Sequence, residues 1–277
     1  MREMTPAEQI ERSLNKRFRK TLWNPFIAAI KRYELIAPGD RIAVCISGGK
    51  DSMLMAKLLQ MLQKHSEFPF EVRYLCMDPG YTSEIRSSIV RNAEIMGVPL
   101  NIFESDVFEA VKQADTHPCF LCARMRRGCL YRHAQEEGCN KIALGHHLND
   151  VIETTLMSML YGAQIQGMLP RVRSRNFEGM ELIRPLYCVK EQDILAFCRY
   201  HSLAFIQCAC DVSARNMESG NGSKRQEIKQ LIATLKKTNP IIEDNLFAAI
   251  HDVRLDTLLG WKAQGKACVQ SYMESES

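Results

Sequence analysis

The chain has 277 residues, with 36 Lys and Arg against 32 Asp and Glu, so its formal net charge is +4 at pH 7. Hydrophobic residues make up 46% and charged residues 25%, which is typical of globular proteins and excludes disordered and collagen-like classes. No apolar run approaches the ~18 residues of a membrane span, and the charged first 20 residues lack the apolar core of a secretory signal. We therefore expect a soluble, cytoplasmic protein without a membrane partner.

Residues 1–35 are predicted to be helical and basic. Apolar side chains recur every four residues from Leu14 to Ile30, as on one stripe of a helix. The basic residues between them are Lys16, Arg17, Arg19, Lys20, Lys31 and Arg32. These cations form either a solvated helix face or a surface that binds phosphate groups.

From residue 41 onward, short apolar segments alternate with longer amphipathic ones. The predicted strands cover residues 41–46, 70–77, 100–104, 141–145 and 182–185, followed by an extended piece at 203–207. The predicted helices cover residues 52–65, 82–96, 122–137, 150–161 and 191–200. Strands that alternate with helices of this length indicate an α/β fold, a doubly wound and mostly parallel sheet with helical N- and C-terminal extensions.

Composition suggests three parts of the chain: a basic helical segment at 1–35, an α/β domain at 36–210, and a C-terminal part at 211–277. The last part opens with a polar loop at 211–223 that is rich in Gly, Ser and Asn. Two or three helices are predicted to follow it, with a break at Pro240.

A glycine-rich turn follows the first predicted strand, with the sequence Ser47-Gly48-Gly49-Lys50-Asp51-Ser52. Ligands of a doubly wound sheet bind beyond the carboxyl ends of the strands. Glycines let a phosphate approach the backbone, and the next helix offers free N–H groups and the positive end of its dipole. Ser47 and Ser52 can add hydroxyl donors and Lys50 a charge, so the turn is a candidate phosphate site; the alternative is a simple tight turn.

The patterns GxxxxGK[ST] and GxGxxG are both absent. The SGGKDS string instead resembles the PP-loop of the ATP-pyrophosphatase superfamily, whose members cleave ATP between the α- and β-phosphates and adenylate a substrate oxygen. The resemblance implies that residues 47–52 bind the ATP phosphates. It also implies catalytic roles for Lys50 and Asp51, with Asp51 as a ligand of Mg²⁺.

Two further segments resemble this superfamily. Met77 and Asp78 end the second predicted strand, where members seat the adenine and ribose of ATP. The segment Leu144-Gly145-His146-His147-Leu148-Asn149-Asp150 resembles LGHHxDD, with Asn149 where an acid is common. This implies that Gly145 approaches the nucleotide and that Asp150 is a catalytic carboxylate and a magnesium ligand. Without the resemblance, the two histidines and Asp150 would suggest a zinc site.

Eleven cysteines in a chain without an export signal argue against a disulfide framework. Most lie within apolar segments and are expected to be small buried side chains. Cys119 and Cys122 form a CxxC pair followed by three arginines, and cationic neighbours at a helix start favour thiolates. Such a pair binds a metal or a cluster, forms a redox pair, or is structural.

The segment from Cys119 to Gly162 closely resembles the bacterial tRNA 2-thiocytidine synthetases, the TtcA family. The stretches Gly167-Met168-Leu169-Pro170 and Ile183-Arg184-Pro185-Leu186 extend the resemblance, which runs from the glycine turn to about residue 210. The family carries a [4Fe–4S] cluster on the CxxC cysteines and one later cysteine. By this resemblance the cluster ligands are Cys119, Cys122 and Cys208, with Cys210 as the alternative to Cys208 and zinc as the alternative to the cluster.

The same resemblance implies an ATP-dependent tRNA sulfurtransferase that thiolates C2 of a cytidine at position 32. Its cofactors are ATP, Mg²⁺ and the cluster, and its partners are tRNA, a sulfur donor such as a cysteine desulfurase, and a second copy in a homodimer. Basic residues supply phosphate contacts; the candidates are Lys16, Arg17, Arg19, Lys20, Arg124, Arg126 and Arg127. Two alternatives stay open: a thiouridine synthetase with a persulfide relay, and a nucleotide- or metal-sensing protein without turnover.

Overall fold

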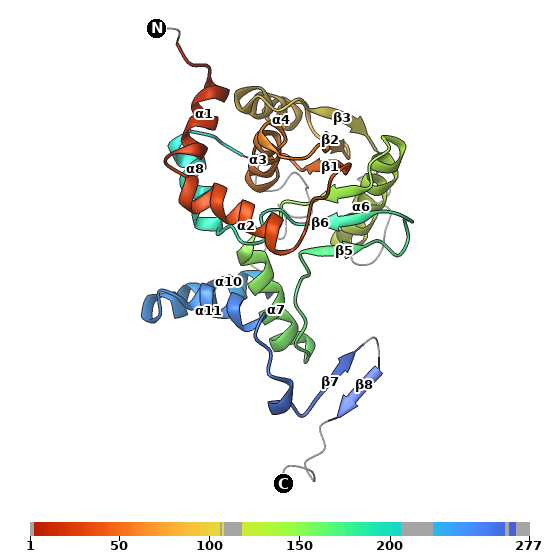
Figure 1. Cartoon of the computed structure of the whole chain (residues 1–277), viewed down its shortest axis with the longest axis vertical. Coiled ribbons are helices and arrows are strands. Elements are labelled where there is room, and N and C mark those ends of the chain that lie inside the picture. The colour runs from red at the N-terminus through yellow and green to blue at the C-terminus, as the bar shows by residue number, and fades with distance from the viewer. Residues whose placement is uncertain (1–2, 106, 108–117, 206–223, 264–265, 270–277) are drawn as a thin grey trace. The chain divides into compact units, whose positions relative to one another are not determined.

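The computed structural model describes residues 3–105, 107, 118–205, 224–263 and 266–269 (Figure 1). By its internal contacts the chain divides into two compact units, Met1–Ile228 and Lys229–Ser277. The N-terminal helices belong to the first unit. The boundaries suggested at residues 35 and 210 stay interpretations of the composition.

A six-stranded sheet with the strand order β3-β2-β1-β4-β6-β5 forms the centre of the first unit. Its strands are β1 (Arg41–Ile46), β2 (Glu71–Asp78), β3 (Asn101–Glu104), β4 (Lys141–Ala143), β5 (Arg171–Arg173) and β6 (Glu181–Ile183). All neighbouring strands pair in parallel except β5 and β6, which are antiparallel. The predicted α/β fold with a mostly parallel sheet is therefore confirmed.

Strand β1 lies between β2 and β4 and is buried from Ile42 to Ile46. Its alternate side chains face opposite sides of the sheet. Ala43 and Cys45 belong to one core cluster with Tyr131 of α6 (Pro118–Glu136), while α3 (Lys50–His65) packs against β1 and β2. A strand covered on both faces needs an apolar side chain at every position, which explains the run Ile-Ala-Val-Cys-Ile.

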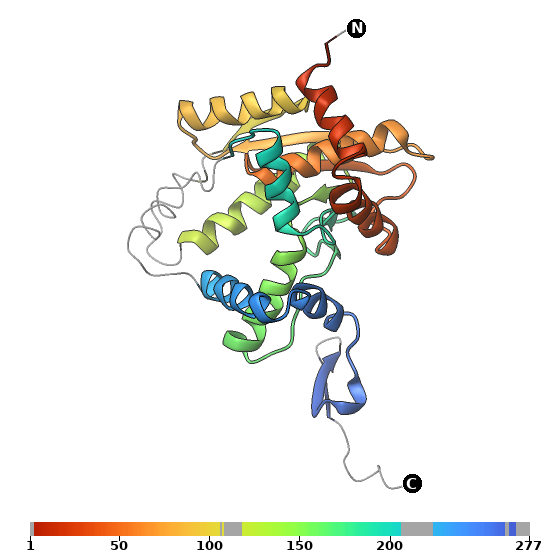
Figure 2. The same cartoon turned by 90° about the vertical axis from the view of Figure 1, so that its left-hand side faces the viewer.

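The other helices of the first unit include α4 (Ser83–Met96), α7 (Leu148–Gly162) and α8 (Glu191–Tyr200). Helix α4 begins at a Thr82 cap and ends at Gly97, which has a left-handed φ of 64°. Helix α8 packs on α3, and α1 (Pro6–Asn15) packs on α4. Figure 2 shows α1 in red beside one end of α4 in yellow.

The N-terminal segment contains three helical pieces where the sequence predicted a continuous stripe. Helix α1 is followed by a π-helical turn at Arg19–Trp23 and then by α2 (Asn24–Arg32). The predicted apolar stripe is nevertheless buried throughout, and it comprises Leu14, Phe18, Leu22, Phe26 and Ile30. The extra residue per turn in the π-helical piece keeps the stripe directed toward the core.

The second unit contains the main part of α10 (Lys224–Thr238), then α11 (Ile242–Ala249), a 3₁₀ turn at Leu255–Thr257, and the strands β7 (Gly260–Ala263) and β8 (Lys266–Val269). Pro240 lies between α10 and α11, where the break was predicted. The predicted helices are present, and β7 and β8, which were not predicted, follow them as an antiparallel hairpin. Within the described residues, no helix has both the length and the apolar character needed to cross a membrane.

The five predicted strands of the sheet agree with the structure within about two residues, but β5 was missed because Arg171-Val172-Arg173 is short, basic and mostly exposed. Residues 203–205 of the predicted extended piece are in no strand. Residues 206 and 207 and the predicted loop at 211–223 lie outside the described residues.

Candidate active site

The glycine turn occupies residues 47–49, between the end of β1 and the start of α3. Gly48 has a left-handed φ of 81°, and a Cβ there would lie 2.7 Å from the side chain of Ile89, so glycine is required at this position. The Ser52 hydroxyl donates to the Gly49 carbonyl (3.0 Å) and accepts from the Ser47 N–H (3.1 Å). These bonds fix the turn's conformation before any ligand binds.

The start of α3 has the properties of an anion site. Its N-cap residue is Gly49, and no side chain caps the helix. The first N–H groups of this 16-residue helix therefore lack a side-chain partner and carry the positive end of the helix dipole. A phosphate group fits this combination.

The loop after β4 runs directly against the start of α3. A Cβ on Gly145 would lie 2.9 Å from the backbone nitrogen of Ser52 and 3.1 Å from the carbonyl carbon of Asp51. Gly145 is therefore needed for the contact between these two backbone segments. Its predicted approach to a nucleotide stays a prediction.

Lys50 lies between two carboxylates. Its Nζ atom is 3.0 Å from Oδ2 of Asp51 and 3.0 Å from Oε1 of Glu191, the first residue of α8. Burial disfavours the charge on Lys50, but Asp51 and then Glu191 outweigh it and raise the pKa of Lys50 above its ordinary value. Lys50 is therefore held as a cation beside the glycine turn.

Asp51 has one carboxylate oxygen suited to a cation. Its Oδ2 atom binds Lys50, while its buried Oδ1 atom has no hydrogen-bond partner among the described residues. The Nε2 atom of His147 is 3.9 Å from Oδ1. A buried carboxylate oxygen is costly without a partner, and a magnesium ion held by the phosphates of ATP fits it.

Asp150 has protein partners for both oxygens. It is the third residue of α7 and forms a reciprocal capping box with His147, in which the His147 N–H donates to Oδ2 (3.1 Å). Its Oδ1 atom is 3.2 Å from Nη1 of Arg225 on α10. A magnesium ion at Asp150 would have to displace or share these partners, so Asp51 fits the metal better.

His146 lines the same loop with its Nδ1 atom buried and without a hydrogen-bond partner in the described residues. Burial lowers the pKa of His146 to about 4, and the positive charge of Arg184 adds to this effect. The ring is therefore neutral at pH 7. The zinc alternative finds no support, because no group of three or more His, Cys, Asp or Glu residues in the described ranges could hold a metal ion. The absence of such a group does not exclude Mg²⁺ binding, since this ion needs only one or two carboxylates beside the phosphates.

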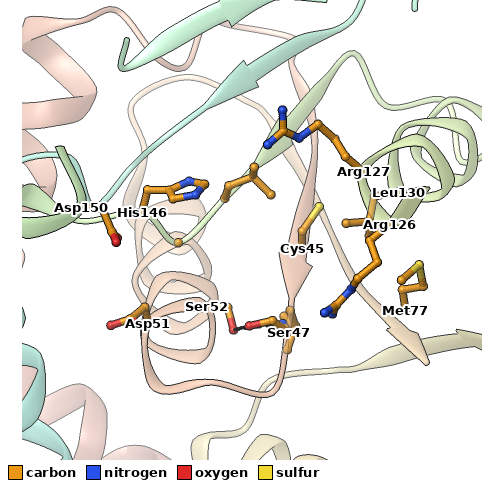
Figure 3. Close-up of a pocket in the computed structure, with 13 residues that line it drawn as sticks. Cys45, Ser47, Asp51, Ser52, Met77, Arg126, Arg127, Leu130, His146 and Asp150 are labelled. Carbon is orange, nitrogen blue, oxygen red and sulfur yellow. Dashed lines mark hydrogen bonds between the residues drawn. The ribbon is translucent and has the colours of Figure 1, made fainter. Parts of the chain in front are cut away.

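A cavity of about 360 Å³ lies at this edge of the sheet (Figure 3). Its lining residues are Cys45, Ile46, Ser47, Asp51, Ser52, Met77, Arg126, Arg127, Leu130, Leu144, Gly145, His146 and Asp150. Figure 3 shows Asp51, His146 and Asp150 on one side of it and the two arginines of α6 on the other. The volume is in the range of small-molecule sites.

Most of the predicted ATP-binding residues meet in this cavity, but four do not line it: Gly48, Gly49, Lys50 and Asp78. Gly48 and Gly49 belong to the turn at its edge, and Lys50 is the first residue of α3. The carboxylate of Asp78 accepts bonds from the N–H groups of Gly80 (3.0 Å) and Tyr81 (2.7 Å), so it holds the turn after β2. An ATP contact of Asp78 stays a prediction.

Helix α6 brings positive charge to the cavity. Arg126 and Arg127 line it, and Arg126 donates to the Tyr81 hydroxyl (3.3 Å), whereas Arg124 is exposed and does not line it. Arg126 and Arg127 are thus placed at the cavity beside the glycine turn as well as being candidate RNA contacts. Cys119 and Cys122 are among the first five residues of α6. The predicted ligand Cys208 and its alternative Cys210 lie outside the described residues.

Three residues of the site were missed from the sequence: Glu191, Arg225 and Arg184. Arg184 is 8% exposed, its Nε atom has no partner among the described residues, and one of its other nitrogens donates to the Leu169 carbonyl. Burial and then Arg127 lower the pKa of Arg184 to about 10. Only Arg184 had a signal in the sequence, because it belongs to a stretch that carries the family resemblance.

Residues 8–217 match the PP-loop domain family, a range that includes the glycine turn, the sheet and Asp150. The fold and the site therefore define a PP-loop protein, and the chain belongs to that family. The tRNA-cytidine(32) 2-sulfurtransferase of Aliivibrio fischeri is 37% identical over 262 residues, 91% of this chain and 80% of that protein. Its namesake in Coxiella burnetii is 34% identical and covers 88% of this chain and 94% of that protein. At this identity and coverage the chain belongs to the tRNA-cytidine(32) 2-sulfurtransferase family, as the resemblance predicted.

A solved structure confirms the fold independently. The U34-tRNA thiolase NcsA from Methanococcus maripaludis, solved with its [4Fe–4S] cluster, superposes with a TM-score of 0.64 over 83% of this chain and 77% of that one. The sequences are 21% identical, so the likeness extends to the fold alone.

Proposed function

We propose that this chain is an ATP-dependent tRNA sulfurtransferase that adenylates O2 of cytidine 32 and replaces that oxygen with sulfur. The observation that carries the proposal is the uncapped start of α3 with Lys50 and Asp51, beside a cavity lined by two arginines. The match to relatives named for this reaction over about nine-tenths of the chain supports it. The substrates are then a tRNA and ATP.

Each residue of the site has a distinct role in this proposal. The backbone of residues 47–52 and the Lys50 ammonium bind the phosphates that leave as pyrophosphate. Asp51 presents its unpartnered oxygen to Mg²⁺, which neutralises phosphate charge. Arg126 and Arg127 offset the negative charge that develops as AMP leaves the base.

We also propose that Cys119, Cys122 and Cys208 hold a [4Fe–4S] cluster. Cys119 and Cys122 are three residues apart in a helix, so their backbone positions share one face of α6. A cluster held by these three cysteines would have one iron without a protein ligand, to which a sulfur species could bind. Iron content after anaerobic reconstitution tests the third ligand: Cys208→Ala should lose the cluster and Cys210→Ala should keep at least half of the iron, and the reverse pattern would assign Cys210.

The proposed product is tested by incubating the protein with unmodified tRNA, ATP, Mg²⁺ and a sulfide source. Nucleoside analysis of the digested tRNA should then show 2-thiocytidine, and Lys50→Ala should give none while unfolding at a similar temperature. A thiolated uridine would favour a thiouridine synthetase. Bound ATP without AMP release or thiolation would favour a sensing protein.

As part of the same proposal, the protein works in the cytoplasm, takes sulfur from a cysteine desulfurase, and forms a homodimer. The cytoplasmic location follows from the tRNA substrate. The sulfur donor follows from a reaction that consumes sulfur. Light scattering on the purified protein measures the oligomeric state directly.

A further inference from the structure

A second cavity, of about 570 Å³, lies between the N-terminal helix and the end of α8, away from the glycine turn. Its lining comes from α1, from residues just before and just after α1, from the last residue of α8, and from the two residues that follow α8. Figure 1 shows α1 and α8 side by side. The ring centroids of Phe18, three residues after α1, and Phe197 of α8 are 5.5 Å apart. The hydroxyl of Ser13 in α1 is 2.7 Å from Nε2 of His201, the residue after α8.

This cavity carries positive charge without compensation. Arg12, Lys16 and Arg17 line it, and none of its described lining residues is acidic. None of the three cations forms an ion pair within the described part of the chain. The nearby Glu11 is already bound by Lys57 (2.7 Å) and Lys64 (2.9 Å), so it does not neutralise them.

An aromatic platform lies beside these cations. Tyr200 is 55% exposed although it is a large aromatic residue. The guanidinium of Arg17 lies 4.7 Å from the centre of the Tyr200 ring, which orients it over that ring. Guanidinium planes and aromatic rings both stack on unpaired bases of RNA.

We infer that this cavity binds a nucleotide of an RNA strand, with the backbone phosphate on Arg12, Lys16 and Arg17 and the base stacked on the pair of Arg17 and Tyr200. The inference rests on the proposed function and extends it by a second contact site for the tRNA. Helix α8 begins at Glu191, which binds Lys50, and ends at Tyr200. Its ten residues span about 15 Å, which corresponds to about four stacked nucleotides. One strand can therefore contact both sites.

The test measures the affinity of the full-length protein for an unmodified tRNA transcript at several salt concentrations, together with its affinity for ATP. Arg17→Ala should weaken tRNA binding about tenfold and reduce the slope of log affinity against log salt by about one. Tyr200→Ala should weaken binding about tenfold without changing the slope. Tyr200→Phe, which keeps the ring, and Arg73→Ala, which removes a cation paired with Glu71 on β2, should stay within about twofold of the wild type.

ATP affinity and the unfolding temperature distinguish three cases: the RNA-site inference is wrong, the proposed function is wrong, or a variant has lost its fold. All four variants should bind ATP as the wild type does. If Arg17→Ala and Tyr200→Ala bind tRNA normally, or if Arg73→Ala weakens binding as much as Arg17→Ala, the cavity is not an RNA site and the proposed function stands. A wild-type protein that binds ATP but no tRNA would overturn the proposed function and this inference together. If Tyr200→Ala unfolds, the tRNA affinity of Arg17→Ala decides whether the cavity is an RNA site. Arg17 is exposed, so its truncation should leave the fold intact.

Discussion

His146 changes its proton affinity on folding. Burial and the nearby Arg184 lower its pKa from 6.5 to about 4. Between these two values the unfolded chain binds a proton that the folded protein does not, so stability falls as the pH falls through this window. From pH 7 to pH 5 the loss is about 2 kcal/mol.

Urea unfolding at both pH values measures this loss. His146→Asn should reduce the difference by about 2 kcal/mol, which is the share that the buried ring contributes. An unchanged pH dependence in His146→Asn would show that the buried ring is not the cause.

Two glycines form a matched pair of tests. Gly145→Ala places a methyl group 2.9 Å from the Ser52 backbone nitrogen, where no flexible side chain can yield. We expect a loss of about 1–3 kcal/mol, or a fall of about 5 °C in the unfolding temperature, and weaker ATP binding. Gly128→Ala meets open space inside α6 and should raise the stability by about 0.5–1 kcal/mol. Normal stability in Gly145→Ala would contradict the close approach of the two backbones.

The sequence was sufficient to place single residues whose signal is local. The glycine turn stands out because it follows a predicted strand end. The resemblance to PP-loop motifs, which are also local in the sequence, indicated Asp51 and the loop from Gly145 to Asp150, and their roles stay predictions. Glu191 could not be found in this way, because it is 141 residues from Lys50 in the chain and meets it only through the packing of α8 on α3.

At the level of elements, the start of α7 has two roles. Asp150 caps the helix together with His147 and also pairs with Arg225. Loss of a cap costs about 1 kcal/mol, so any loss of activity in Asp150→Ala combines a weakened helix start with the missing carboxylate. Sequence reasoning found the carboxylate but not the cap, since a histidine at an N-cap is not a strong signal.

Elements were predictable where periodicity was long and regular. The buried strand β1 and the helices α3, α4 and α8 have apolar patterns that extend over a whole element. Strand β5 has three residues, and β7 and β8 have four residues each. The apolar patterns of these strands were too short to predict them from the sequence. Their pairing partners decide their conformation.

At the scale of the whole molecule, the basic N-terminal segment is part of the core of the first unit. Its side chains Ile10, Leu14, Leu22 and Phe26 are at most 1% exposed. Each contributes about 1.5–3 kcal/mol through burial, which together approaches the total stability of a typical domain. Glu11 also pairs with the buried Lys57, whose charge would otherwise be uncompensated.

Deletion of residues 1–35 should therefore abolish the cooperative thermal unfolding transition of the first unit. Arg17→Ala, which changes the exposed surface of the same segment, should unfold like the wild type. A deletion variant with an unfolding temperature within a few degrees of the full chain would show that the segment is a separable appendage.

The central claim is that the cytidine oxygen is activated by adenylation at the glycine turn. The measurement that tests it most directly uses a tRNA whose cytidine 32 carries ¹⁸O at C2, with mass spectrometry of the nucleotide released. The proposed reaction transfers that oxygen to the phosphate of AMP, so AMP should carry one ¹⁸O for each cytidine thiolated. Unlabelled AMP, or ADP in place of AMP, would contradict adenylation of the base.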